Sequence, residues 1–291
     1  AGQQVTAGNA GDIGLLALNG EIVTSGNLAA FSRTPGNSSG SAGDGGFIVA
    51  AAANGIRIAN GAGAVQTFAF SNDAGSAGNG GNVGLLTTDG DIDTGPISAQ
   101  AFSPDGPTGN AGDVLLQADG GAITLGNNFF AALNAGSLGT PPGNGGDVTL
   151  TAQADLTIAG NILTNVAGPD GDAGDIHLFS ATGDIAAADI LAPATSNGVP
   201  GNGGDVTVEA PDGAITTGDV AGFSNAFFIN NDARDGGDIL MKAQGDITTG
   251  GVETYSEARG AQGDAGAGGG IWLESQGGSL TTGGSLRAFS R

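Results

Sequence analysis

Apolar side chains recur at alternate positions in nine short segments of the chain, with a mean spacing of about 32 residues. Each segment follows a position that is Asp in most copies, as in Gly-Asp-Val-Thr-Leu-Thr-Ala at 146–152. The next position is β-branched in every copy: Ile13, Ile48, Val83, Val114, Val148, Ile176, Val206, Ile239 and Ile271. Apolar or small residues follow two and four positions later. This alternation predicts a strand with one face turned inward.

A second aliphatic column lies nine or ten residues after each Asp-like position, beyond turn signals such as Asn19-Gly20 and Asp212-Gly213. Its members are Ile22, Ile56, Ile92, Ile123, Leu156, Ile185, Ile215, Ile247 and Leu280. Most copies add a third segment of the form aliphatic-x-x-aromatic-Ser, for example at 28–32 and 286–290. Each repeat therefore predicts three short strands joined by three corners.

The columns match between residues about 32 positions apart, so equivalent strands are expected to stack on one another rather than to form hairpins. This pattern predicts an all-β fold, a parallel β-helix (β-solenoid) of about nine coils, each about 4.8 Å from the next. The repeats continue without a break in composition. We therefore expect one continuous solenoid over residues 1–291 with no internal domain boundary.

Glycine makes up 59 of the 291 residues, where about 7% is usual. The chain has 10 prolines and no strict glycine triplet, which excludes a collagen helix. Aliphatic residues recur in phase throughout, which is not typical of a disordered chain. The glycines are therefore interpreted as corner residues. The absence of cysteine excludes disulfides and thiolate metal sites.

Charge is strongly one-sided, with 7 Lys and Arg against 29 Asp and Glu and a net charge of −22. Nucleic acids and anionic membranes both require clustered basic residues, so neither is an expected partner. The longest apolar run, at 47–53, is too short to insert into a membrane. Divalent cations are the charged partners that such a surface attracts.

Three glycine-rich phrases carry a resemblance to a known family: Gly-Asn-Gly-Gly-Asp-Val-Thr-Leu-Thr-Ala at 143–152, Gly-Asp-Ile-Thr-Thr-Gly-Gly at 245–251 and Gly-Gly-Ser-Leu-Thr-Thr-Gly-Gly at 277–284. They resemble the repeats of filamentous-haemagglutinin-type exoproteins. The resemblance implies a right-handed β-helical fibre, exported by two-partner secretion, that acts as an adhesin or matrix fibre. It also implies an extracellular or cell-surface location, and glycans or neighbouring cells as partners.

The most regular polar column lies three residues before each Asp-like position: Asn9, Asp44, Asn79, Asn110, Asn144, Asp172, Asn202 and Asp235. Asn and Asp favour tight corners, and stacked side chains of this kind bond from coil to coil, so we predict a structural ladder. A weak calcium site formed by Asp44, Asp172, Asp175, Asp235 and Asp238 is the alternative, because calcium prefers oxygen ligands. No other cofactor is expected.

No catalytic residues are predicted. His177 is the only histidine, and the seven basic residues are scattered through the repeats. A polysaccharide-degrading β-helix enzyme is therefore the remotest alternative, behind a calcium- or glycan-binding module. A threonine column directly after the second-column aliphatic residue is interrupted at Val23, Arg57, Asp93 and Ala186, which disfavours an ice-binding array.

Six aromatic residues follow the third aliphatic column: Phe31, Phe70, Phe102, Phe223, Tyr255 and Phe289. We expect them to stack inside the core, because their phase relative to the aliphatic residue is constant. Stacking along an outer face, where a glycan could bind, is the alternative.

The two ends of the chain are in phase with each other. Residues 286–291 repeat the phase of 28–33, and joining residue 291 to residue 1 places Asp12 33 positions after Gly270. The chain is therefore expected to be part of a longer solenoid or a subunit that associates head to tail. The residues expected at such a junction are Leu15, Ile22, Leu273, Leu280, Leu286 and Phe289.

Overall fold

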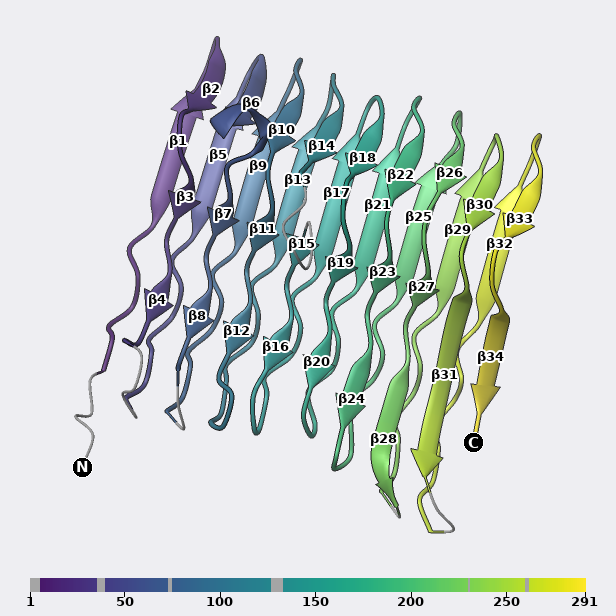
Figure 1. Ribbon diagram of the computed structural model, residues 1–291. Coiled ribbons are helices and arrows are strands. Elements are labelled where there is room, and N and C mark those ends of the chain that lie inside the picture. Colours follow the sequence, from purple (N-terminus) through teal and green to yellow (C-terminus); the bar gives the residue numbers. More distant parts are fainter. Residues whose placement is uncertain (1–5, 36–39, 73–74, 127–132, 230, 260–261) are drawn as a thin grey trace.

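The computed structural model describes residues 6–35, 40–72, 75–126, 133–229, 231–259 and 262–291. The chain is a β-solenoid in which equivalent strands of successive coils lie side by side along one rod, from the N-terminal to the C-terminal end (Figure 1). Every strand pairing in the described residues is parallel, and the helical content there is one 3₁₀ turn, η1 (Ala59–Gly61). The predicted fold class is confirmed.

The first sheet contains the first strand of each coil. Its nine strands are β1 (Ile13–Ala17), β5 (Ile48–Ala52), β9 (Val83–Thr87), β13 (Val114–Ala118), β17 (Val148–Ala152), β21 (Ile176–Ser180), β25 (Val206–Ala210), β29 (Ile239–Ala243) and β32 (Ile271–Ser275). The register pairs each β-branched residue of the predicted column with the next, from Ile13 on Ile48 to Ile239 on Ile271. This column is therefore confirmed in full.

The second sheet is built in the same way from shorter strands. They are β2 (Glu21–Thr24), β6 (Gly55–Ile58), β10 (Ile92–Thr94), β14 (Ile123–Leu125), β18 (Leu156–Ile158), β22 (Ile185–Ala187), β26 (Ile215–Thr216), β30 (Ile247–Thr249) and β33 (Leu280–Thr282). The predicted second column is in register from Ile22 on Ile56 to Ile247 on Leu280.

The third side of the coil differs from the prediction, because most coils carry two short strands there instead of one. The first pieces are β3 (Leu28–Ala29), β7 (Val65–Gln66), β11 (Ile97–Ser98), β15 (Leu133–Asn134), β19 (Ile162–Leu163), β23 (Ile190–Leu191) and β27 (Val220–Ala221). The second pieces are β4 (Ser32–Arg33), β8 (Ala69–Phe70), β12 (Ala101–Phe102), β16 (Ser137–Leu138), β20 (Val166–Ala167), β24 (Ala194–Ser196) and β28 (Ser224–Ile229). The last two coils have one long strand each, β31 (Val252–Arg259) and β34 (Leu286–Ser290), and β31 connects both rows into a 16-stranded sheet.

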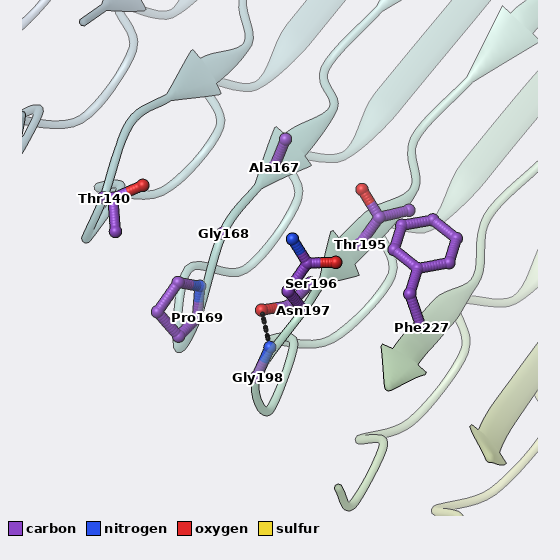
Figure 2. A pocket seen from close by; sticks show the side chains of 9 residues that line it. All are labelled: Thr140, Ala167, Gly168, Pro169, Thr195, Ser196, Asn197, Gly198 and Phe227. Carbon is purple, nitrogen blue, oxygen red and sulfur yellow. Dashed lines mark hydrogen bonds between the residues drawn. The ribbon is translucent and has the colours of Figure 1, made fainter. Parts of the chain in front are cut away.

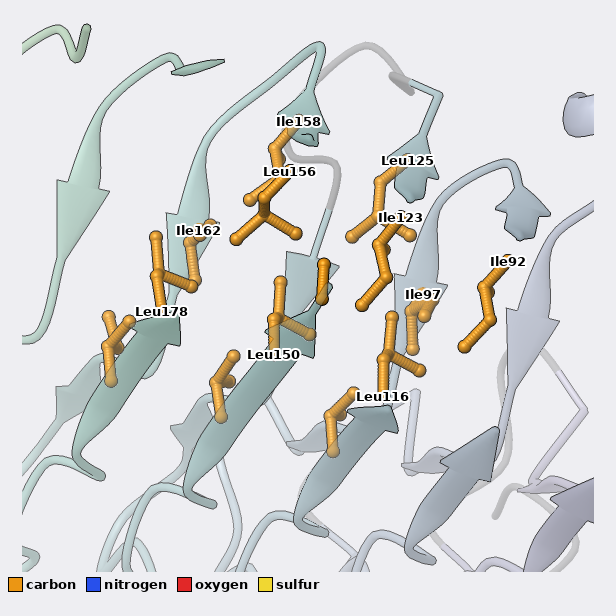
Figure 3. Packing of buried hydrophobic residues seen from close by; sticks show 14 of the residues in the cluster. Ile92, Ile97, Leu116, Ile123, Leu125, Leu150, Leu156, Ile158, Ile162 and Leu178 are labelled. Carbon is orange, nitrogen blue, oxygen red and sulfur yellow. The ribbon is translucent and has the colours of Figure 1, made fainter. Parts of the chain in front are cut away.

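The core is a stack of equivalent aliphatic side chains that fills the interior of the coils (Figure 3). Leu116, Leu150 and Leu178 lie in consecutive coils of the first sheet and are fully buried. Each is covered by its equivalent one coil before and one coil after. At about 1.5–3 kcal/mol for each fully buried side chain, this stacking opposes the entropy lost when the coils become ordered.

The glycine before each Asp-like position is required by the close approach of neighbouring coils. A Cβ built on Gly174 would lie 2.2 Å from the carbonyl oxygen of Gly146, and one on Gly204 would lie 2.1 Å from that of Gly174. Gly11 occupies the same position in the first coil and has nothing within 4 Å of such a Cβ. The requirement therefore comes from the preceding coil.

The expectation that the aromatic residues stack inside the core is wrong, because none of the six belongs to the aliphatic core. Tyr255 is only 9% exposed, but its ring is covered by Phe223 and Phe289. Phe70 and Phe102 alternate with the buried Ala69 and Ala101, so their rings lie on the outer face of the third sheet. The inner positions of this row hold Ala or Ser, and Val at Val166. The serine hydroxyls bond to nearby backbone, as Ser224 Oγ does to the Gly201 carbonyl at 2.8 Å.

The outer rings form two columns rather than one. Phe31 stacks on Phe68, with ring centroids 4.6 Å apart, and Phe70 stacks on Phe102 at 4.9 Å. At the other end of the rod, Tyr255 lies between Phe223 and Phe289, at 4.4 and 4.8 Å. The alternative of stacking along an outer face is thus the arrangement that the structure adopts.

Candidate functional site

The predicted corner ladder is a continuous row of side-chain to backbone hydrogen bonds. The Oδ1 atom of each Asn or Asp accepts the backbone N–H of the equivalent residue in the next coil, at 2.6–3.2 Å. The bonded pairs, acceptor first, are Asn9 and Asp44, Asp44 and Asn79, Asn79 and Asn110, Asn110 and Asn144, Asn144 and Asp172, Asp172 and Asn202, Asn202 and Asp235, and Asp235 and Ala267. Amide and carboxylate oxygens are interchangeable here, which explains why Asn and Asp alternate freely along the column.

A second ladder runs through the Asp-like positions themselves. Oδ1 of Asp12 accepts the Phe47 N–H at 2.9 Å. From Asn82 onward, each Oδ1 accepts the N–H of the next residue in the column at 2.7–3.0 Å, in the order Asn82, Asp113, Asp147, Asp175, Asp205, Asp238 and Gly270. Phe47 has no acceptor, so the ladder is interrupted once. The strand register continues across this gap, since Ile48 pairs with Val83.

Sequence reasoning missed two further partial ladders. One uses the Asp just before the second strand, as in the bond from Ala214 N–H to Asp184 Oδ1 at 2.8 Å. The other precedes the third strand, where Asp189 accepts from Asp219 N–H at 2.9 Å and Asp219 accepts from Gly251 N–H at 2.7 Å. The recurring phrase Gly-Asp-Ile before the second strand is the signal that would have identified the first of these.

The five consecutive aspartates of the second ladder, from Asp113 to Asp238, bring carboxylates close together along the rod. Desolvation in the packed corner raises the pKa of Asp175 above its usual value, and the charges of Asp205 and Asp147 raise it further. The hydrogen bond from Asp205 N–H acts in the opposite direction. This stack is therefore a place where ladder bonding and charge repulsion compete.

The residues of the calcium hypothesis are held mainly by these ladders. Oδ1 of Asp44, Asp172, Asp175, Asp235 and Asp238 each accepts a backbone N–H from the next coil. Within the described residues, no group of three His, Cys, Asp or Glu side chains is placed to hold a metal ion. Calcium binding stays a prediction.

The single histidine and the single tryptophan lie apart from each other on the outer face of the first sheet. His177 is half-buried between Thr149 and Thr207 of the neighbouring coils, and Trp272 is 61% exposed beside Leu240. In the part of the chain that the structure covers, no helix is long and apolar enough to cross a membrane.

The two end coils expose part of the apolar column that interior coils bury. In the last coil, Leu280 is 44% and Leu286 52% exposed, and Leu273 and Phe289 are partly exposed. In the first coil, Leu15 is partly exposed, whereas Ile22 is only 9% exposed. All six predicted junction residues therefore lie in end coils, with the larger apolar exposure at the C-terminal one.

No protein-family model, curated protein or solved structure matches this chain. The resemblance to filamentous-haemagglutinin-type repeats accordingly stays a prediction, together with the handedness and export route that it implies.

Proposed function

We propose that this chain is a section of an extracellular structural fibre or adhesin, a rod that continues by stacking coil on coil. The observation that carries the proposal is the match between the two end coils: both present strands and apolar side chains in the phase used between interior coils. An unpaired strand edge with apolar neighbours is a template for a further strand. The next coil belongs either to the continuing chain or to a second copy.

A junction of this kind repeats the contacts found inside the rod. Leu273 would cover Leu15, Leu280 would cover Ile22, and Phe289 would stack on Phe31 as Tyr255 stacks on Phe289. The ladders do not need to be complete, since Ala267 and Gly270 lack a side-chain acceptor just as Phe47 does inside the rod. Head-to-tail contacts that repeat in this way generate a filament rather than a closed oligomer.

A non-catalytic role agrees with the dispersed basic residues and the single histidine. The net charge of −22 favours a rod that stays soluble and does not adhere to nucleic acid or anionic membranes. These properties, with the family resemblance, support a location at the cell surface and partners there such as glycans or neighbouring cells.

Gly11→Ala tests the proposal, because its new methyl group points to the open face of the first coil. Nothing lies within 4 Å of that methyl in a single copy, whereas the equivalent methyl on Gly46 would lie 2.1 Å from the carbonyl oxygen of Gly11. The substitution should leave the single rod folded and weaken stacking of another coil at least tenfold. Gly14→Ala is the matched control, since Gly14 also has nothing within 4 Å and its equivalent Val49 projects outward.

The measurement is sedimentation velocity over a concentration series, combined with electron microscopy of the same samples. The unsubstituted chain and Gly14→Ala should form longer rods as concentration rises, and Gly11→Ala should stay as short rods. Single short rods of the unsubstituted chain at every concentration would contradict association between copies. Native material consisting only of separate short rods would contradict the fibre itself.

A further inference from the structure

A groove of about 450 Å³ lies on the side of the rod, over the second strands of the third sheet (Figure 2). It is lined by Thr140, Ala167, Gly168, Pro169, Thr195, Ser196, Asn197, Gly198 and Phe227. These residues come from consecutive coils, so the groove runs along the rod axis. Its volume is in the range of ordinary ligand sites.

The groove exists because outward side chains become small over two coils. The outward column of this sheet reads Phe102, Leu138, Ala167, Thr195 and Asn225 in register. Ala167 and Thr195 are the smallest of the five and lie between larger neighbours. The groove is therefore a gap in a column of side chains that otherwise covers the sheet.

One wall is formed by an aromatic ring that a β-bulge pushes out of the sheet. The register between β28 and β31 shifts between Asn225 and Ile229, so that β28 contains two more residues than its partner over this interval. Phe227 is 44% exposed and lines the groove, and the guanidinium of Arg259 lies 5.7 Å from its ring centroid. Bulges of this kind re-aim side chains and are over-represented near functional sites.

The remaining lining is uncharged and combines small or apolar residues with a few polar groups. It provides the hydroxyls of Thr140 and Thr195 and the side-chain amide of Asn197, which projects between Pro169 and the ring of Phe227 in the view of Figure 2. Ser196 Oγ accepts the Gly198 N–H at 2.8 Å and so holds the turn at the base of the groove. No charged side chain is among the residues that line the groove.

We propose that this groove binds an extended, uncharged oligosaccharide, with one sugar ring stacked on Phe227. The C–H face of a pyranose packs on an aromatic face, and its hydroxyls bond to hydroxyl and amide groups, which are the groups found here. The surrounding charge of −22 disfavours acidic glycans. The coil spacing of about 4.8 Å is close to the advance per residue of an extended β-linked sugar chain, so equivalent groups of successive coils can meet successive sugars.

This inference rests on the glycan partners of the proposed function and gives their site and chemical class. It is separate from the coil-on-coil association, because the groove is complete within one copy and lies away from both ends. It identifies a ligand class for the side of the rod. The Gly11→Ala variant should bind saccharide with unchanged affinity, which separates the two proposals experimentally.

The test is calorimetric titration with cellohexaose and chitohexaose as extended β-linked probes, and with maltohexaose as an α-linked probe of different shape. At least one β-linked probe should bind, more tightly than maltohexaose. Phe227→Ala should weaken that binding about tenfold, the effect expected for loss of one aromatic contact. Phe228→Ala is the matched control: Phe228 is the next bulge residue, is 60% exposed and does not line the groove, so affinity should change less than twofold.

A second variant fills the groove without disturbing the fold. Ala167→Leu introduces the side chain that the preceding coil already carries at the same outward position, Leu138. It should abolish saccharide binding and leave the melting temperature unchanged. The proposal is overturned if neither β-linked probe binds the unsubstituted chain, or if both Phe227→Ala and Ala167→Leu bind with unchanged affinity.

Discussion

The interior coils and the last coil carry the same apolar pattern but differ in burial. Leu156 and Leu280 are both leucines in the second column, yet Leu156 is fully buried and Leu280 is 44% exposed. Val252 is fully buried, whereas Leu286, the next residue in its column, is 52% exposed. Leu280 and Leu286 have a neighbouring coil on one side only, whereas Leu156 and Val252 have one on both sides. In the first coil, Ile22 and Leu28 also have one neighbour but are only 9% and 8% exposed, so the exposure of the last coil depends on which side is open.

This contrast shows that a single repeat cannot bury its own apolar face. Stability in such an array is close to a sum of intrinsic repeat terms and nearest-neighbour terms. The end coil lacks one neighbour term, which is the physical reason for its exposed leucines. Three pairs of substitutions and one single substitution would sharpen or break this interpretation. All are measured by denaturant unfolding of the 291-residue chain at a low concentration that keeps it as single rods.

The largest effect is expected for Leu156→Ala, which should lower the free energy of unfolding by about 2–5 kcal/mol, since it leaves a cavity in a packed stack. Leu280→Ala, the same change in the last coil, should cost less than about 1 kcal/mol because its side chain is already half in water. Equal losses at the two positions would refute the nearest-neighbour account.

The next pair compares glycines at equivalent corners. Gly174→Ala should destabilise the chain by about 1–3 kcal/mol, because its methyl would lie 2.2 Å from the Gly146 carbonyl oxygen and the coils must separate to admit it. Gly11→Ala in the first coil should be within about 0.5 kcal/mol of the unsubstituted chain. A comparable loss for Gly11→Ala in single rods would show that the cost does not come from the preceding coil.

A smaller effect is expected when a rung of the corner ladder is removed. Asn110→Ala brings into an interior coil the residue type that the last coil carries at this position, Ala267. It removes the acceptor for Asn144 N–H and should cost about 1 kcal/mol. Asn110→Asp keeps Oδ1 and should cost less than half as much. A ladder with no energetic role would make the two variants equal.

The smallest effect has the opposite sign. In Asp175→Asn, the amide oxygen replaces the carboxylate oxygen as acceptor for the Asp205 N–H, and the desolvated charge is removed. At neutral pH the substitution should therefore stabilise the chain by about 0.2–1 kcal/mol, the range for relieving like charges across a strand pair. Because the pKa of Asp175 is raised in the folded chain, the folded state takes up a proton first as pH falls. Its contribution to stability therefore improves between the raised pKa and the ordinary value near 3.9, and levels off below it.

The check is the difference in unfolding free energy between Asp175→Asn and the unsubstituted chain, measured from neutral pH down to about pH 4. The difference should shrink as pH falls, and added sodium chloride should shrink it at neutral pH. A constant difference across pH and salt would mean that the carboxylate stack carries no repulsion.

Much of the architecture could be predicted from the chain alone, because the aliphatic columns are strictly periodic. Every predicted member of the first two columns is in register, and the eight residues from Asn9 to Asp235 form the ladder that their spacing indicated. Periodicity is visible in sequence since each column repeats the same environment. The sequence did not indicate which way the aromatic rings point, because Phe packs favourably both in a core and in a stack on an outer face.

The groove was not predictable for a related reason. Ala167 and Thr195 look like ordinary strand residues. Phe227 lies in the bulge of β28, two positions after Asn225, which is in register with Glu257 of β31. The position of the Phe227 ring depends on how β28 pairs with β31, and the paired residues are about 30 apart in sequence.

By itself, the sequence determined the fold class, the number of repeats, the inward-facing columns, the acidic surface and the matching phase of the two ends. Only the tertiary structure decided which face the aromatic rings occupy, how the third side divides into short strands, which glycines are required, and where the groove forms. The physical reason is that alternation of polarity specifies which side chains avoid water, while close approach between coils depends on shape. Shape is defined only when one coil is packed against the next.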